Sequence, residues 1–248
     1  MTGGCRPYQN RVSPWGTLTA VATRYPRETA CFGNRGCLHD DNKEVVRAFA
    51  SKAWLACKLE VDRTRKVQRN DNRAFNGRRR VLFSPSRYTE LFFLDEATAL
   101  AAGHRPCSCC RRAAFDAFMV EWARSHPSEE RWSAARVDTA LHTQRIDGGG
   151  HKRRHAISGD VKHLPDGAML ELVREGEEES SAWLVWRGSL LRWSHQGYCE
   201  RISKELPLPG GSLLTPPGTI AVLSSGAIVP RVDPSADLLS AQPPGSSV

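Results

Sequence analysis

The 248-residue sequence lacks any run of about 18 apolar residues, the length that a membrane-spanning helix requires. Its first residues, MTGGCRPYQNR, are not followed by an apolar segment of the kind that marks a secretory signal. We therefore expect a soluble, cytoplasmic protein. In a reducing compartment the eight cysteines are expected to be free or metal-bound rather than paired in disulfides.

Established catalytic motifs are also missing. The sequence contains no P-loop, no G-x-S-x-G nucleophile motif and no glycine pattern for dinucleotide binding. It has no carboxylate cluster of the kind that magnesium nucleases use, and no internal repeat. These absences exclude an assignment to the common hydrolase, nucleotide-binding or dehydrogenase classes on the basis of motifs.

Positive charge is plentiful and unevenly distributed. The chain has a formal net charge of +8, and nine Lys or Arg stand against two Asp between Asp62 and Arg87. A second basic run, HKRRH at 151–155, follows three glycines. This distribution favours an anionic partner, and we expect nucleic acid. The alternative is solvated loops that have no partner. The candidate contacts are Arg78, Arg79, Arg80, Arg87, Lys152 and Arg153.

Apolar spacing predicts the elements of the first half. We expect Asp40 or Asp41 to cap a helix over KEVVRAFASKAW, and a strand over WLACKLEV that points Cys57 inward. A strand over YTELFFL is followed by a helix that Asp95 caps and Gly103 ends. Two further helices are expected, one from about Cys109 to before Pro127 and one over about 129–144.

The second half has the pattern of short strands. The runs GAMLELV, AWLVW and SLLRWS are separated by turn residues, as in an antiparallel meander, and a short helix is expected after LTPPG. We therefore predict an α+β protein with an α-rich, metal-linked N-terminal part that includes short strands, followed by a β-rich antiparallel C-terminal part. It either folds as two units or forms one continuous domain. The predicted regions are an irregular lead-in (1–30), a metal-binding α+β region (31–147), a glycine-rich basic linker (148–157), a β-rich region (158–232) and a flexible tail (233–248).

The spacing of Cys107 and Cys110 is the strongest chemical signal in the sequence. Two thiolates in Cys-x-x-Cys spacing on a tight turn can bind one zinc ion from the same side. The other ligands must come from elsewhere, and the candidates are Cys31, Cys37, His39, Cys57, His104 and Cys109. Cys57 on its strand and His39 in a loop are the most economical choice, because they would approach the turn from two sides.

The stretch around this cysteine pair, FFLDEATALAAGHRPCSCCRR at 92–112, resembles the second half of the zinc-binding N-terminal domain of Ada-type DNA repair proteins. The shared residues are Phe92, Phe93, Ala101, Ala102, Gly103, Arg105, Pro106, Cys107, Cys110 and Arg111. The resemblance implies a local fold of strand, helix and cysteine turn, zinc bound at the cysteine pair, and DNA binding.

One part of that family pattern is absent. The family's first cysteine pair includes the methyl-accepting thiolate, but this chain has no cysteine between Cys57 and Cys107. Methyl transfer is therefore not implied, and we expect the metal to be structural. The alternatives are a metal-free remnant of the motif and a redox pair, although no thioredoxin-like βαβ pattern surrounds it.

A second group of polar residues occurs in LHTQRIDGGGHKRRH. His142 and Arg145 are three residues apart on an expected helix, Asp147 follows its end, and His155 returns after the glycines. Such a set suits phosphate binding, and a histidine with a neighbouring aspartate suits general acid or base catalysis in phosphodiester or glycosidic chemistry. The alternative function is therefore an enzyme that acts on a nucleotide or nucleic acid through these four residues. The same residues also suit a basic loop that binds anions without chemistry.

Overall fold

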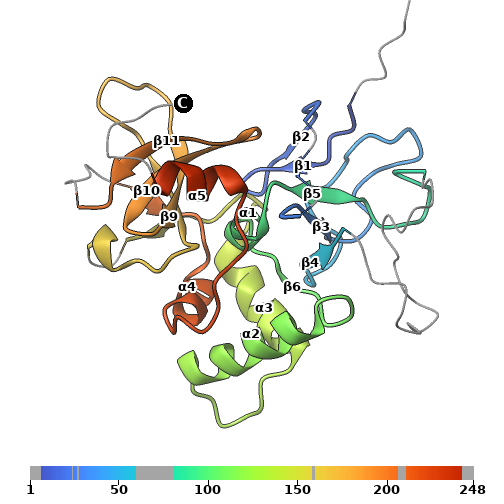
Figure 1. The fold of residues 1–248 in the computed structure, drawn as a ribbon. Helices are drawn as coiled ribbons and strands as arrows, with labels where there is room; N and C mark the ends of the chain where they lie inside the picture. Colours follow the sequence, from blue (N-terminus) through green and yellow to red (C-terminus); the bar gives the residue numbers. More distant parts are fainter. Residues whose placement is uncertain are drawn as a thin grey trace, which may run out of the picture.

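The computed structural model describes residues 7–23, 25–26, 28–59, 81–157, 160–205 and 211–241, and these form two six-stranded sheets with helices between and beside them (Figure 1). In the N-terminal sheet, the β1–β5 and β4–β6 pairs are parallel and the other pairs are antiparallel. Its strands, in spatial order, are β2 (Leu18–Thr19), β1 (Arg11–Val12), β5 (Leu91–Phe93), β3 (Cys31–Asn34), β4 (Leu55–Lys58) and β6 (Arg105–Pro106).

The C-terminal sheet is antiparallel throughout and contains the predicted meander. Arg187 and Gly188 form the turn of a hairpin between the strands that end at Trp186 and begin at Ser189. Both turn residues have positive φ, of 46° and 74°. A two-residue turn of this kind matches the twist of the strands it joins. In spatial order the strands are β11 (Gly197–Ser203), β10 (Ser189–Ser194), β9 (Ser181–Trp186), β8 (Met169–Leu172), β12 (Ser212–Leu213) and β7 (His155–Ala156).

The prediction of an α-rich N-terminal part is wrong. The described residues contain five α-helices and make a mixed α/β fold, and only one of these helices precedes residue 107. The N-terminal half is instead organised by a sheet, because its short apolar runs pair with one another across long sequence separations. The helices are α1 (Glu96–Ala101), α2 (Arg112–Ser125), α3 (Ala134–Arg145), α4 (Pro217–Leu223) and α5 (Pro234–Ser240), with a 3₁₀ turn η1 at Val161–His163.

Several segments predicted to be irregular contain regular structure. Strands β1 and β2 lie in the predicted lead-in, and β7 lies in the predicted linker. The described part of the predicted tail contains α5, whose Ala236 and Leu239 are buried against the C-terminal sheet. No helix in the described ranges combines the length and the apolar character that crossing a membrane requires.

The predicted helix over KEVVRAFASKAW is absent. The Asp40 carboxylate accepts a hydrogen bond from the Glu44 N–H at 3.0 Å, and Lys43 adopts a φ of 66°. The chain then runs back along itself, with the Val46 N–H donating to the Leu38 carbonyl at 2.9 Å. An aspartate side chain can close a tight turn as readily as it caps a helix. Here the turn forms, and the apolar residues that suggested a helix belong to a returning loop.

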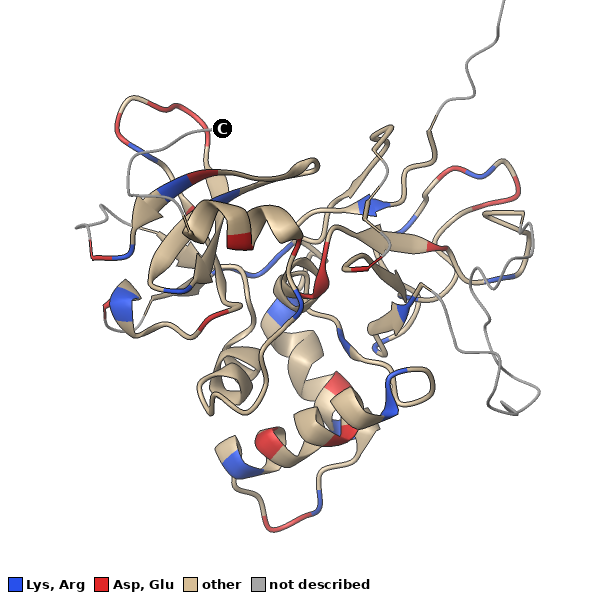
Figure 2. Cartoon of the chain, in the orientation of Figure 1, with Lys and Arg blue, Asp and Glu red and all other residues tan. Residues whose placement is uncertain are grey.

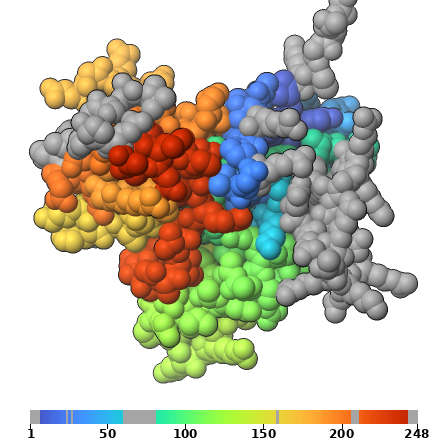
Figure 3. Space-filling model, viewed as in Figure 1, coloured from blue at the N-terminus to red at the C-terminus, as the bar shows by residue number. Residues whose placement is uncertain are grey.

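Helix α1 lies between the two sheets and is buried along its whole length (Figure 1). As predicted, Asp95 caps its start and Gly103, with φ of 91°, follows its end. A side chain at Gly103 would collide with the aliphatic part of Arg145, because a Cβ there would lie 2.7 Å from it. One apolar cluster contains residues of α1 together with residues of β8, β9, β10 and α5. A second apolar cluster, formed by the N-terminal sheet, contains Ala99 of α1, so the helix packs against both sheets. The segments that carry the sheets form one continuous surface (Figure 3).

The Asp95 carboxylate connects α1 to the C-terminal part of the chain. It accepts hydrogen bonds from the N–H and hydroxyl of Thr98, at 2.8 and 2.7 Å. It also accepts from the Tyr198 hydroxyl at 2.8 Å and from the Asp233 N–H at 3.0 Å. Burial raises the pKa of Asp95, although these hydrogen bonds act in the opposite direction. Four donors from three segments thus depend on one buried carboxylate.

Replacing Asp95 with alanine is expected to destabilise the protein by about 3 kcal/mol or more. The substitution removes a helix cap worth about 1 kcal/mol, and it leaves the buried Tyr198 hydroxyl and Asp233 N–H without an acceptor, at about 1–3 kcal/mol for each buried donor. Chemical denaturation measures the loss. Ser133→Ala is the matched control, because Ser133 caps α3 at an exposed position. Equal losses in the two variants would contradict the connecting role of Asp95.

Candidate metal centre

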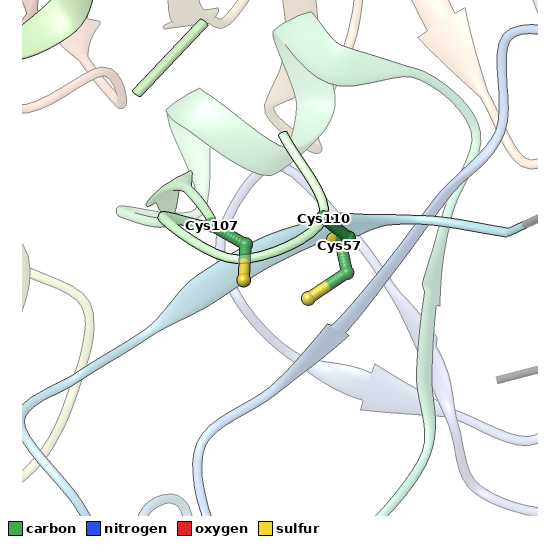
Figure 4. Close-up of side chains that lie close together, drawn as sticks. All are labelled: Cys57, Cys107 and Cys110. Carbon is green, nitrogen blue, oxygen red and sulfur yellow. The ribbon is translucent and has the colours of Figure 1, made fainter. Parts of the chain in front are cut away.

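Three cysteine side chains converge beside the N-terminal sheet. The sulfur atoms of Cys57, Cys107 and Cys110 all lie within 4.8 Å of one another, and the three residues could hold a metal ion. Cys57 projects from β4, whereas Cys107 and Cys110 project from the turn after β6, so the strand and the turn face each other (Figure 4). The prediction that Cys57 joins the cysteine pair agrees with this geometry.

Sheet pairing brings the strand and the turn together. Strand β6 runs parallel to β4, and the Cys107 N–H continues the pairing by donating to the Ala56 carbonyl at 3.0 Å. The chain then turns, and the Arg111 N–H donates to the Cys107 carbonyl at 3.1 Å just before α2 begins. Cys107 is thereby fixed next to the residue before Cys57. The Cys-x-x-Cys spacing brings Cys110 back to the same point.

The surroundings of the cluster favour sulfur anions. The Cys109 N–H donates to the Cys107 sulfur, and the Lys58 N–H donates to the Cys110 sulfur, both at 3.4 Å. Hydrogen bonds from Cys110 and Cys57 lower the pKa of Cys107, and the same contacts with Cys107 raise the pKa of Cys57 and of Cys110. One thiolate therefore forms readily, and repulsion opposes a second and third. A metal cation removes that repulsion and allows all three thiols to ionise.

A buried ion pair attaches the cysteine turn to the central helix. The Arg111 guanidinium donates to the Glu96 carboxylate, and both side chains are only 6–7% exposed. The other Glu96 oxygen accepts the Arg231 N–H at 3.2 Å. Glu96 is the first residue of α1, so the turn, the central helix and the segment before α5 are held together at one end of that helix.

His39, predicted as the fourth ligand, lies elsewhere. Its Nδ1 is 2.7 Å from the Thr89 hydroxyl and its Nε2 is 3.2 Å from the Ser84 carbonyl, so both ring nitrogens have other partners. The ring also stacks on Phe83, with centroids 4.7 Å apart. His39 therefore supports the loop that leads into β5. Sequence proximity to Cys37 suggested a ligand, but the β3–β4 sheet pairing carries this loop away from the cysteine turn.

The other described cysteines and His104 lie outside the cluster. Cys31 is fully buried, and burial raises the pKa of its thiol to about 12. Cys37 donates to the His39 carbonyl at 3.5 Å, and Cys109 is exposed beside the turn. His104 is buried between Trp54 and Phe93, where burial lowers the pKa of its ring well below the usual value. None of these side chains supplies a fourth ligand.

The structure does not assemble the four residues of the alternative catalytic site. His142 Nδ1 lies 3.1 Å from the Arg145 guanidinium, but His155 Nε2 lies 2.6 Å from the Gln144 carbonyl. The Asp147 carboxylate accepts hydrogen bonds from backbone N–H groups of its own loop. Of these four residues, only His142 and Arg145 form a hydrogen bond with each other. The enzyme hypothesis gains no support from this arrangement.

The predicted nucleic-acid contacts fall into three groups. Arg78, Arg79 and Arg80 lie outside the described residues. Arg87 and Arg153 are exposed. Lys152 differs from the expectation of an open surface contact, because its Nζ donates to the Ala101 carbonyl inside a cavity.

The same cavity contains Arg35 and Trp54, which the sequence did not identify. Arg35 lies outside the predicted helices and strands, and Trp54 lies where a predicted helix ends and a predicted strand begins. No spacing pattern in the sequence distinguishes a buried arginine from an exposed one. Arg145, which was predicted for a catalytic role, also lines this cavity. Three basic or aromatic residues that are far apart in sequence therefore meet at one place.

Serine substitution of Cys57, Cys107 or Cys110 is expected to abolish stoichiometric metal binding, because each removes one of the three thiolates available to an ion. Elemental mass spectrometry of the purified full chain measures the metal content. Cys109→Ser and His39→Gln are the controls and should retain the metal of the unmodified protein. Metal loss in His39→Gln, or full retention in Cys57→Ser, would contradict the ligand set.

Comparison with known proteins identified no relative of this chain. No family model matches the chain, and no curated protein or solved structure matches it either. The resemblance of residues 92–112 to Ada-type domains therefore stays a prediction from sequence. Evidence for function comes from the residues and the geometry of the site itself.

Proposed function

We propose that this chain is a zinc protein that binds nucleic acid through the Arg-rich segment, residues 62–87, and that the metal holds the base of this segment in place. The observation that carries the proposal is the position of the three cysteines. Cys57 lies five residues before the Arg-rich segment, and its thiol meets the Cys107–Cys110 turn near the end of β4, the strand that precedes the segment.

The described residues that flank the Arg-rich segment lie close to each other. Leu59, just before it, and Tyr88, just after it, pack against one apolar cluster that contains Cys57, Cys107 and Phe32. The Lys58 N–H donates to the Cys110 sulfur at 3.4 Å. A metal bound by the three thiolates would therefore join the strand that enters the segment to the turn beside its exit. Such a cross-link lowers the entropy cost of presenting the segment to a partner.

Zinc suits the donor set better than other metals. Thiolate ligands select zinc, copper(I) or iron–sulfur clusters over magnesium and calcium. In a tetrahedral site with Zn–S bonds of about 2.3 Å, two sulfurs lie about 3.8 Å apart, which is compatible with the separations in the cluster. The resemblance to Ada-type domains also points to zinc. The described residues supply three ligands, so one coordination position belongs to a ligand outside this set.

Charge supports nucleic acid as the partner. Figure 2 shows acidic and basic residues interspersed over the described elements. By contrast, the Arg-rich segment has nine Lys or Arg against two Asp, in a chain whose net charge is +8. A concentrated positive segment attracts the phosphate backbone and releases its counterions on binding. DNA is the preferred form, because the local resemblance is to a family that binds DNA.

Alanine substitution of Arg78, Arg79 and Arg80 together is expected to weaken DNA binding and to reduce its salt dependence. Each lost phosphate contact lowers the log–log salt slope by about 0.9, so the triple variant should lose about 2 to 3 units of slope. Fluorescence anisotropy of a labelled duplex at several salt concentrations measures both quantities, and a single-stranded RNA of equal length tests the preference for DNA.

The control for this experiment is a triple variant with the same loss of charge elsewhere. Arg124, Arg131 and Lys162 are exposed and lie on α2, before α3 and in η1. Alanine at these positions should leave the slope unchanged. Salt-insensitive binding by the unmodified protein, or equal effects of the two triple variants, would overturn the proposed nucleic-acid function.

The role of the metal is tested separately. Cys57→Ser changes no arginine, yet it should weaken DNA binding about tenfold, because the base of the Arg-rich segment loses its cross-link and binding then orders more of the chain. Cys109→Ser should bind like the unmodified protein. Metal loss in Cys57→Ser without any change in DNA affinity would show that the metal and the nucleic-acid contact are unconnected.

A further inference from the structure

Three basic side chains lie together near the C-terminal end of α1, two of them fully buried and the third, Lys152, partly buried. Arg35 and Arg145 are 2% and 0% exposed, and the Lys152 Nζ donates to the Ala101 carbonyl. Both guanidinium groups lie over the Trp54 ring, 3.9 and 4.1 Å from its centroid. All four residues line one cavity of about 600 Å³. Buried charges of one sign normally lie beside a partner of opposite sign.

The protein partners of these three cations are neutral. Arg35 donates to the Gly16 carbonyl at 2.9 Å and to the uncharged ring of His104 at 3.2 Å. Arg145 donates to the Gly103 carbonyl at 2.9 Å and to the Lys52 carbonyl at 2.5 Å. Within the described ranges, no carboxylate forms an ion pair or hydrogen bond with Arg35, Arg145 or Lys152.

Donor capacity remains unused on two arginines that line the cavity. Arg35 Nη2 and Arg145 Nε are buried and have no hydrogen-bond partner in the described part of the chain. A guanidinium N–H that is buried and unpaired costs free energy, because it has lost its water without gaining an acceptor. Two such donors on neighbouring arginines mark a place where acceptor oxygens of a ligand fit.

The nearby carboxylates are already neutralised by other arginines. Both Asp138 oxygens accept from Arg105, at 2.8 and 2.7 Å. Glu171 also lines the cavity, but its carboxylate binds Arg154 and accepts from the Trp15 indole N–H at 2.9 Å. Burial alone would raise the pKa of Glu171, yet these contacts lower it to about 2, so it stays ionised and paired. The remaining charge of the cavity is positive.

Burial lowers the pKa of all three basic side chains. Burial, followed by repulsion from Arg145, lowers the pKa of Arg35 to about 9. Burial also lowers the pKa of Arg145 to about 9. Burial and the two arginines lower the pKa of Lys152 to about 7. An anion in the cavity would reverse this effect, because it favours the charged form of all three groups.

We propose that this cavity binds a phosphate monoester of nucleotide size. A phosphate dianion presents several oxygens to donors at once, and guanidinium groups match its geometry. The volume also admits an organic body beside the phosphate, because ligand cavities span about 300–1,000 Å³. The apolar side chains of Leu18 and Val45 and the Trp54 ring contribute the non-polar lining. The residues that line the site include none of the cysteine cluster and none of the Arg-rich segment.

Isothermal titration calorimetry of the full chain at neutral pH tests the proposal with three probes: inorganic phosphate, adenosine 5′-monophosphate and adenosine. The first two should bind and adenosine should not, because the recognised group is the phosphate. Lys152→Met should weaken binding of the monophosphate about 10- to 100-fold, since a charge-assisted hydrogen bond is lost. The same variant should unfold at a higher temperature without ligand, because a cation that Arg35 and Arg145 repel is removed.

The controls separate this site from the basic surface. Arg153→Met changes the neighbouring, exposed residue and should leave binding unchanged. The Arg78, Arg79 and Arg80 triple variant should also bind the monophosphate normally, even if it fails to bind DNA. For the unmodified protein, phosphate should raise the unfolding temperature more than sodium chloride of equal ionic strength does.

Four results would overturn the proposal. They are no thermal stabilisation by phosphate, equal binding of adenosine and its monophosphate, equal weakening by Arg153→Met and Lys152→Met, and loss of monophosphate binding in the triple variant. The thermal measurement uses only the unmodified protein, so it decides the question even if Lys152→Met does not fold.

Discussion

The structure depends on the burial of one short helix, α1, between two sheets. Six residues cannot form a stable helix alone in water, because nucleation is costly and few hydrogen bonds repay it. The helix persists because its ends are held by side chains from elsewhere. At its start, Asp95 caps the first turn and also accepts from Tyr198 and Asp233, which belong to the C-terminal part of the chain. The two sheets are joined through this contact.

Both candidate sites are attached to this helix, at opposite ends. The cysteine turn is held at the start of α1 by the buried pair between Arg111 and Glu96. The cationic cavity meets the other end, where the carbonyls of Ala101 and Gly103 accept from Lys152 and Arg145. Carbonyl groups at the end of a helix carry partial negative charge and stabilise cations there. A disturbance of α1 would therefore displace both sites.

Local signals made part of this predictable from the sequence. Asp95, the left-handed Gly103 and the cysteine pair act over a few residues, so their neighbours in the chain reveal their roles. Features built by long-range pairing were not predictable in this way. The helix expected after Asp40 gave way to a turn, because aspartate serves both structures. Arg35 meets Arg145 across 110 positions of sequence, and no periodicity records that contact.

Charge also separates the roles of the two sites. One divalent ion and three thiolates carry a net charge of −1, since two positive charges meet three negative ones. A site of that charge repels phosphate, which favours a metal that organises the chain over one that contacts a nucleic acid directly. The cavity has the opposite character, because Arg35, Arg145 and Lys152 lack acidic partners in the described residues. In the proposed function, recognition of phosphate therefore falls to arginine and lysine, and the metal acts by joining β4 to the cysteine turn.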